Sequence, residues 1–210
     1  NLGRSWKLHH MPGMRSYTLV RIGTDIYVSN FNTVLCRFTG KGFERVEGVE
    51  MFPEAPEPHP EARVGTRLMV RPVVFRSRAV YIGADSVNDQ HWHPFAIYSA
   101  GVIGGDPMAE KIPIDGEPWD LLLGERHLYA LTAEIVEHRD THPYLVRVWY
   151  TADLKNWQEV MHFRCQTFAR SFELLDGDFY FGLGCGTDTP WPPQTGQILR
   201  VKGEHFALPK

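Results

Sequence analysis

The sequence has no apolar run approaching the roughly 20 residues that a membrane-spanning helix needs, so a transmembrane anchor is not expected. It also has no excess of basic side chains: 22 Lys and Arg residues stand against 25 Asp and Glu residues, for a formal net charge of -3. Without a basic stripe, the phosphate backbone of a nucleic acid is a poor ligand. We therefore expect neither a membrane nor a nucleic acid as a partner.

Cysteine is scarce. The three cysteines are Cys36, Cys165 and Cys185, with no C-x-x-C spacing. An odd number without that spacing argues against a dense disulfide framework or a zinc knuckle. Cys165 and Cys185 lie in one repeat and are candidates to pair, but we favour burial as reduced thiols. The sequence begins at Asn1 without a visible signal peptide, and we make no prediction of the cellular compartment.

A helical period of 3.6 residues is not sustained in any stretch of the chain. The pattern that recurs is an apolar residue followed by tyrosine. Successive tyrosines are 54, 48 and 51 residues apart. Repeats of about this length are typical of propeller blades and other repeat folds. The four pairs are Ile26-Tyr27, Val80-Tyr81, Leu128-Tyr129 and Phe179-Tyr180.

Each tyrosine falls in the second strand of a predicted four-strand unit. Apolar and polar residues alternate in these segments, which are rich in β-branched and aromatic residues and bounded by turn signals such as Asp176-Gly177. The predicted strands are 17–22, 25–29, 34–38 and 43–46, then 69–75, 79–84, 95–99 and 110–114, then 119–123, 128–133, 145–150 and 157–162, and finally 171–175, 178–183, 196–201 and 204–208.

The fold predicted from these units is all-β, a single β-propeller domain over residues 1–210. Four-stranded repeats of this length match propeller blades, which bury both sheet faces against their neighbours. A β-sandwich, the alternative, explains the strands but not their repeated order. Residues before Arg15 are too few for another blade, so they either close the ring with one strand or are the remnant of a fifth blade. The four blades are expected at about 15–50, 64–114, 117–163 and 168–209, with 53–60 as an exposed proline-rich connector.

The sharpest local motif is Thr151-Ala152-Asp153-Leu154-Lys155-Asn156-Trp157, at the turn between the last two strands of the third unit. An Asp here can accept hydrogen bonds from backbone N–H groups of the turn, and the Trp can pack between blades. The motif resembles S-x-D-L-x-x-W, found in five-bladed glycosidases of the arabinanase and β-xylosidase type and of the invertase type. It is one residue shorter than the sialidase Asp box and lacks its glycine. In those families the motif is structural and lies away from the substrate.

The resemblance implies a carbohydrate-related function, either glycoside hydrolase-like or degenerate. The arabinanase-type enzymes use three acidic residues from three blades, one of them an Asp near the chain start. No Asp precedes Asp25 here, so that acid has no counterpart. A sialidase-like site would use a Tyr nucleophile assisted by a Glu, and Tyr17 beside Glu173 would mimic that pair.

Candidate site residues come from the starts of the first strands, which face the central channel of a propeller. We superpose 15–18 on 170–173, with 117–120 in the same register. Two carboxylates at the channel mouth suit acid–base chemistry on a glycoside, and paired arginines suit an acidic sugar. In the alternative, Arg15–Glu173 or Arg170–Asp120 salt bridges only tie the blades together. The predicted catalytic residues are Asp120 and Glu173, and the predicted substrate-binding residues are Arg15, Tyr17, Arg71, Trp119, Arg170 and His93.

Histidine and tryptophan gather in the loops between second and third strands. His91 and His93 flank Trp92, and His138 and His142 lie in the matching loop of the next unit. A His-x-His pair on a strand can bind a metal, but in a loop we favour solvated histidines and assign no metal and no cofactor. The expected partner is a carbohydrate or an acidic small molecule. The alternative is a non-enzymatic scaffold that binds a protein or a glycan through this loop face.

Overall fold

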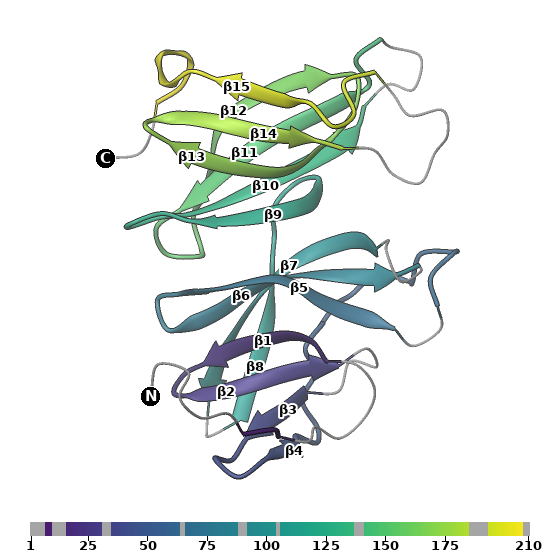
Figure 1. The fold of residues 1–210 in the computed structure, drawn as a ribbon, viewed down its shortest axis with the longest axis vertical. Helices are drawn as coiled ribbons and strands as arrows, with labels where there is room; N and C mark the ends of the chain where they lie inside the picture. Colours follow the sequence, from purple (N-terminus) through teal and green to yellow (C-terminus); the bar gives the residue numbers. More distant parts are fainter. Residues whose placement is uncertain are drawn as a thin grey trace.

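The structure is a computed structural model that describes residues 7–9, 16–30, 35–63, 66–87, 92–103, 106–136, 141–184 and 193–207. These residues form fifteen β-strands and one short 3-10 helix, arranged as four antiparallel sheets that follow one another along the chain (Figure 1). Within these ranges no helix is long and apolar enough to cross a membrane. The prediction of an all-β chain built from four similar units is confirmed.

Each of the first two sheets is a four-stranded meander in which every strand pairs with the next one along the chain. The first sheet consists of β1 (Ser16–Ile22), β2 (Asp25–Asn30), β3 (Leu35–Phe38) and β4 (Phe43–Arg45). The second consists of β5 (Arg67–Phe75), β6 (Arg78–Ser86), β7 (Trp92–Ile103) and β8 (Asp106–Ile112).

The third sheet repeats this order, and the fourth repeats three of its strands. The third consists of β9 (Glu117–Leu123), β10 (Leu128–Ile135), β11 (Tyr144–Thr151) and β12 (Trp157–Cys165). The fourth consists of β13 (Ala169–Leu175), β14 (Asp178–Leu183) and β15 (Ile198–Val201).

The predicted final strand over 204–208 is wrong. A 3-10 helix, η1 (Gly203–His205), occupies that place. The Asp178 carboxylate accepts a 2.7 Å hydrogen bond from the Gly203 N–H and turns the chain back onto the β13–β14 hairpin. A Cβ at Gly203 would lie 2.5 Å from the Gly177 carbonyl oxygen, so only glycine fits this close approach. Phe206 then packs on Phe179, with ring centroids 4.9 Å apart.

The hydrophobic core consists of three layers, each between two successive sheets. In β6, Tyr81 packs in the layer shared with the first sheet, and its neighbours Val80 and Ile82 pack in the layer shared with the third. β10 divides in the same way, with Leu131 facing the fourth sheet and Ala130 facing the second. The middle strands are therefore buried on both faces, which explains why their sequences are almost continuously apolar.

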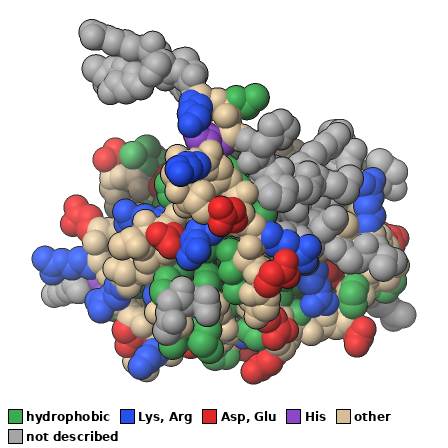
Figure 2. All heavy atoms as spheres, turned by 90° about the horizontal axis from the view of Figure 1, so that it is seen from below, with side chains coloured by type: hydrophobic (Ala, Val, Ile, Leu, Met, Phe, Trp, Pro, Cys, Tyr) green, Lys and Arg blue, Asp and Glu red, His purple; other side chains and the backbone are tan. Residues whose placement is uncertain are grey.

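The first strand of each sheet contacts the first strand of the next: β1 with β5, β5 with β9, and β9 with β13. The first and last sheets lie at opposite ends of the view in Figure 1. The described strands form separate sheets and do not close into a barrel. On the face shown in Figure 2, acidic and basic side chains are interspersed around exposed hydrophobic ones, so neither sign of charge dominates that face.

The proline-rich connector after the first sheet is largely exposed, as predicted, but it is anchored at both ends. The Tyr81 hydroxyl donates a 2.6 Å hydrogen bond to the Met51 carbonyl oxygen, and Phe52 is buried against the second sheet. The Arg67 guanidinium donates to the Pro56 carbonyl oxygen. The connector is thereby held against the second sheet.

Candidate functional site

A β-bulge interrupts the first strand of every sheet, and it positions the residues predicted to face the axis. The strand registers leave an extra residue at Tyr17 in β1, Trp119 in β9 and Arg170 in β13, and a two-residue irregularity at 71–72 in β5. The bulges therefore make Tyr17, rather than Arg15, the counterpart of Arg170. The predicted superposition is correct between the first and third units and is two residues out for the fourth.

Two of the predicted arginines line one small hollow of about 220 Å³. Arg71 from β5 and Arg170 from β13 meet there with Thr18 from β1 and with Trp92. Arg71 has a φ of 50°, an unusual value for a non-glycine residue, because it occupies the β5 bulge. Arg15 and the side chain of Tyr17 lie outside the described residues.

Asp120 is not open to the hollow, because three donors hold its carboxylate. Oδ1 accepts a 3.0 Å hydrogen bond from the Leu121 N–H and lies 3.5 Å from Arg71 Nε, and Oδ2 accepts a 3.3 Å hydrogen bond from the Phe172 N–H. The side chain is only 12% exposed, and burial raises its pKa. Asp120 thus joins the second, third and fourth sheets, with Arg71 as its ionic partner in place of the expected Arg170.

Glu173 lies on the exposed side of β13. Its carboxylate accepts a 3.1 Å hydrogen bond from the N–H of the next residue, Leu174. It is near enough to Asp120 to raise the pKa of that carboxyl group, as the smallest of several contributions. The two predicted catalytic carboxylates are therefore neighbours in different surroundings, one clamped by donors and the other in solvent.

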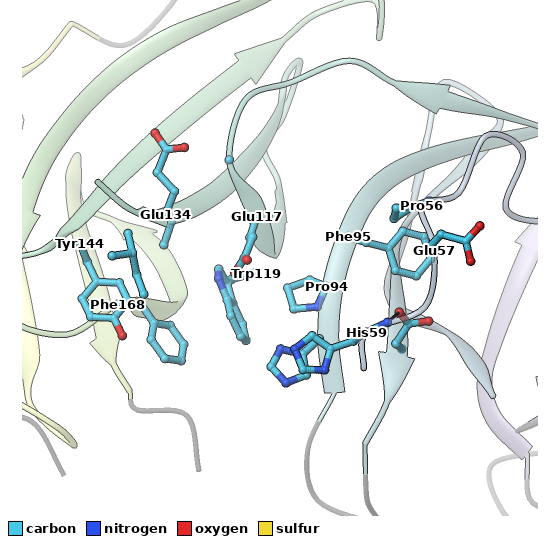
Figure 3. Close-up of a pocket in the computed structure, with 15 residues that line it drawn as sticks. Pro56, Glu57, His59, Pro94, Phe95, Glu117, Trp119, Glu134, Tyr144 and Phe168 are labelled. Carbon is cyan, nitrogen blue, oxygen red and sulfur yellow. Dashed lines mark hydrogen bonds between the residues drawn. The ribbon is translucent and has the colours of Figure 1, made fainter. Parts of the chain in front are cut away.

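A larger cavity of about 650 Å³ lies between the second and third sheets and reaches the fourth (Figure 3). Trp119 and Phe168 stack along it with centroids 4.4 Å apart, and Tyr144 packs on Phe168 at 5.8 Å. Phe95 and the connector's Pro56 belong to the opposite side, near the second sheet. Trp119 and Phe168 are themselves buried, so the half-buried Tyr144 and Phe95 provide the ring surface on which a ring-shaped ligand can stack.

Carboxylates accompany these aromatic rings. Glu117 is an exposed residue, but desolvation of its carboxyl group within the cavity raises its pKa; His59 opposes this shift and Glu134 adds to it. Glu134 also lines the cavity and forms an ion pair with Arg147. Glu57 and Asp85 complete the acidic lining. The cavity therefore offers hydrogen-bond acceptors together with one carboxyl group that retains its proton to a higher pH than usual.

Predicted residues Trp119 and His93 line this cavity rather than the small hollow. The His93 ring stacks on the His59 ring, with centroids 3.9 Å apart and planes within 8°. Of the predicted loop histidines, His91 and His138 lie outside the described residues. Cys36 and Cys165 are buried free thiols, as predicted, and Cys185 lies outside the described residues.

Sequence reasoning missed the residues that make this cavity distinctive: His59, Glu117, Glu134, Tyr144 and Phe168. Glu117 begins the segment 117–120 that we aligned with the other first strands, and it lines the cavity together with Trp119. The others come from a connector, two later strands and a loop, and no spacing in the sequence relates them.

No protein-family model matches the chain, and no curated protein matches it. Similar solved structures include a Saccharomyces cerevisiae assembly of Dbp5 bound to Nup159, Gle1, IP6 and ADP, with 11% identity and a TM-score of 0.32 over 87% of this chain and 50% of that one. Another is a mutant of the Synechocystis apocarotenoid oxygenase, with 9% identity and a TM-score of 0.37 over 87% of this chain and 44% of that one. The chain thus spans half or less of either structure, and scores this low bear on neither fold family nor activity.

Proposed function

We propose that the protein binds a carbohydrate in the cavity between the second and third sheets. The proposal rests on the half-buried aromatic rings of Tyr144 and Phe95, which share one cavity of about 650 Å³ with carboxylates. These carboxylates belong to Glu117 and Glu134. A pyranose or furanose ring presents a C–H face that packs on an aromatic ring and hydroxyl groups that donate to carboxylates. The volume falls in the usual range for small-ligand sites.

We also infer that the four sheets are blades of a β-propeller, either a complete small ring or part of a five-bladed one. In support, the first strands contact one another in order, each carries a bulge at the equivalent place, and the core layers lie between successive sheets. The likeness of residues 151–157 to the turn motif of five-bladed glycosidases points the same way. In this arrangement Asp120 is a tie between blades and the ligand site lies off the axis.

Glycoside hydrolysis is the second candidate, and the raised pKa of Glu117 favours it. A carboxyl group with a raised pKa is better suited than an ordinary one to protonate a leaving-group oxygen. Glu134, near enough to affect the Glu117 pKa, is the second carboxylate that such chemistry requires. A purely scaffolding role through the loop face is the remaining alternative.

The test is calorimetric titration of the chain with arabinosides, xylosides and sialosides, beside the variant Tyr144→Ala. Tyr144 is half-buried at the cavity, so losing one stacking ring should weaken binding about 2- to 10-fold. Tyr180→Ala is the matched control, because Tyr180 lies on β14 under Arg200 and outside the cavity lining. Absence of binding across the panel, in folded protein, would refute the carbohydrate proposal.

The same panel as chromogenic glycosides separates binding from hydrolysis. If Glu117 is the general acid, turnover disappears in Glu117→Gln while binding persists, and the wild-type rate falls as the pH rises through the Glu117 pKa. Glu173→Gln is the control, because Glu173 is exposed outside the cavity lining. Binding without turnover would leave a carbohydrate-binding protein, and loss of turnover only in Glu173→Gln would move the chemistry to the axis.

A further inference from the structure

Two histidines and a glutamate gather at the edge of the cavity. His59, Glu61 and His93 each offer one possible metal-ligand atom, and these three atoms lie within 4.8 Å of one another. His59 belongs to the connector, Glu61 directly follows it before β5, and His93 belongs to β7. His59 and His93 both line the cavity, and Figure 3 shows His59 next to Pro94 at its edge. Chain segments far apart in sequence thus bring together three side chains of the types that bind transition metals.

Asp85 links the two histidines, through its carboxylate at His59 and through strand pairing at His93. Asp85 Oδ2 accepts a 2.9 Å hydrogen bond from the His59 N–H, and Asp85 is the direct cross-strand partner of His93 in the β6–β7 pair. Arg67 Nε lies 3.4 Å from the other oxygen of Asp85, which is 3% exposed as a residue. The Ala62 N–H donates a 2.8 Å hydrogen bond to the His59 carbonyl oxygen and closes the turn that carries Glu61.

The separation of the three ligand atoms is close to what a metal ion requires. Tetrahedral zinc with bonds of about 2.0–2.2 Å to nitrogen and oxygen holds its donors about 3.4 Å apart. His59 and His93 are half-buried and Glu61 is exposed, so rotation of the side chains can close the remaining gap without moving the backbone. Asp85, held by Arg67, stays outside this set and keeps the two backbone segments in place.

Metal binding would change existing contacts. The parallel stack of His59 on His93 would have to open, because a coordinated ion lies in the plane of each ring that binds it. A hydrogen bond would also break. His59 Nδ1 accepts a hydrogen bond from the Glu61 N–H, at a long 3.3 Å. Coordination through Nδ1 occupies that lone pair, and coordination through Nε2 moves the ring proton to Nδ1, so either mode ends the bond. The contact is exposed, so the freed N–H can bond to water and the cost is small.

We propose that His59, Glu61 and His93 form a binding site for a divalent transition-metal ion of the zinc class. Three protein ligands of this composition leave a fourth coordination position for water or for an oxygen of a molecule in the adjacent cavity. The proposal is independent of the carbohydrate hypothesis, since the metal alone is sufficient to test it.

The test is calorimetric titration of the chelator-treated full chain with Zn²⁺, together with the visible spectrum after addition of Co²⁺. We expect one saturable ion per chain and the intense spectrum of a four-coordinate cobalt site. His59→Ala and His93→Ala should each weaken binding about 100-fold or more, because loss of an outer partner alone commonly costs 10- to 100-fold. Glu61→Gln, at an exposed position, should weaken it less and removes any concern about folding.

His162→Ala is the matched control, because His162 is an exposed histidine that contacts Glu159 on β12, away from the cavity. It should bind Zn²⁺ as the wild type does. Far-UV circular dichroism and urea midpoints confirm that each variant is folded. Wild-type protein that binds no ion, or binding that survives in His59→Ala and His93→Ala, would overturn the proposal, the second result by placing the ion elsewhere in the chain.

Discussion

At the scale of single residues, the same residue types have different roles according to the donors around them. Asp120 and Glu173 looked equivalent in the sequence as acids near the starts of first strands. In the structure Asp120 satisfies the backbone N–H groups of Leu121 and Phe172 as well as Arg71, whereas Glu173 is in solvent. The type of residue was predictable, but its partners depend on a bulge that places Arg71 opposite Asp120, and bulges leave little trace in sequence.

Asp120→Ala should lower the free energy of unfolding by about 2 kcal/mol, because it leaves two buried backbone N–H groups without an acceptor. Urea denaturation of wild type and variant measures the difference. Glu173→Ala is the control, expected to change stability by less than about 0.5 kcal/mol as an exposed substitution. Equal effects of the two variants would contradict the assignment of Asp120 as the tie between sheets.

At the scale of strands and turns, the sequence was most informative. Alternation and hairpin turns located fifteen strands, and they gave the bounds of 178–183 correctly, because these signals are local. β7 and β8 begin three and four residues earlier than predicted. The prediction of a final strand over 204–208 was wrong because a contact between residues distant in sequence, Asp178 and Gly203, redirects the chain. The 151–157 turn was understood in advance: Asp153 accepts hydrogen bonds from the N–H groups of Lys155 and Asn156, and Trp157 Nε1 donates to the Leu154 carbonyl oxygen.

The 151–157 turn should contribute a pH-dependent part of the stability. The hydrogen bonds from the Asn156 backbone and side chain, with that from the Lys155 N–H, lower the pKa of Asp153 well below its usual value. A depressed folded-state pKa stabilises the fold above the unfolded pKa of about 3.9, and this is lost as the pH falls. Asp153→Asn should therefore be less stable than wild type at pH 7, with a smaller difference at pH 3. Thermal unfolding at both pH values measures this, with Asp115→Asn as control, and a difference that does not change with pH would contradict it.

At the scale of the whole molecule, the sequence predicted the repeat but not the cavity. A repeat is a property of one chain segment compared with the next, whereas the cavity joins a connector, β7, β9 and the segment before β13. Asp85 links the two histidines of the cavity, His59 on the connector and His93 near the start of β7. A site whose residues come from different repeats cannot be predicted from the spacing of residues within one repeat. The core layers, in contrast, follow from strands that are apolar on both faces.

Three layers between successive sheets imply stability that is transmitted from neighbour to neighbour. Phe181→Ala removes a fully buried ring between the third and fourth sheets and should cost about 3–5 kcal/mol. Hydrogen exchange should therefore accelerate most in β9–β15 and least in β1–β4. Met69→Ala, in the layer between the first and second sheets, should give the reverse pattern. If both variants accelerate exchange equally in all four sheets, the molecule unfolds as one cooperative unit, and the layers do not act as separable interfaces.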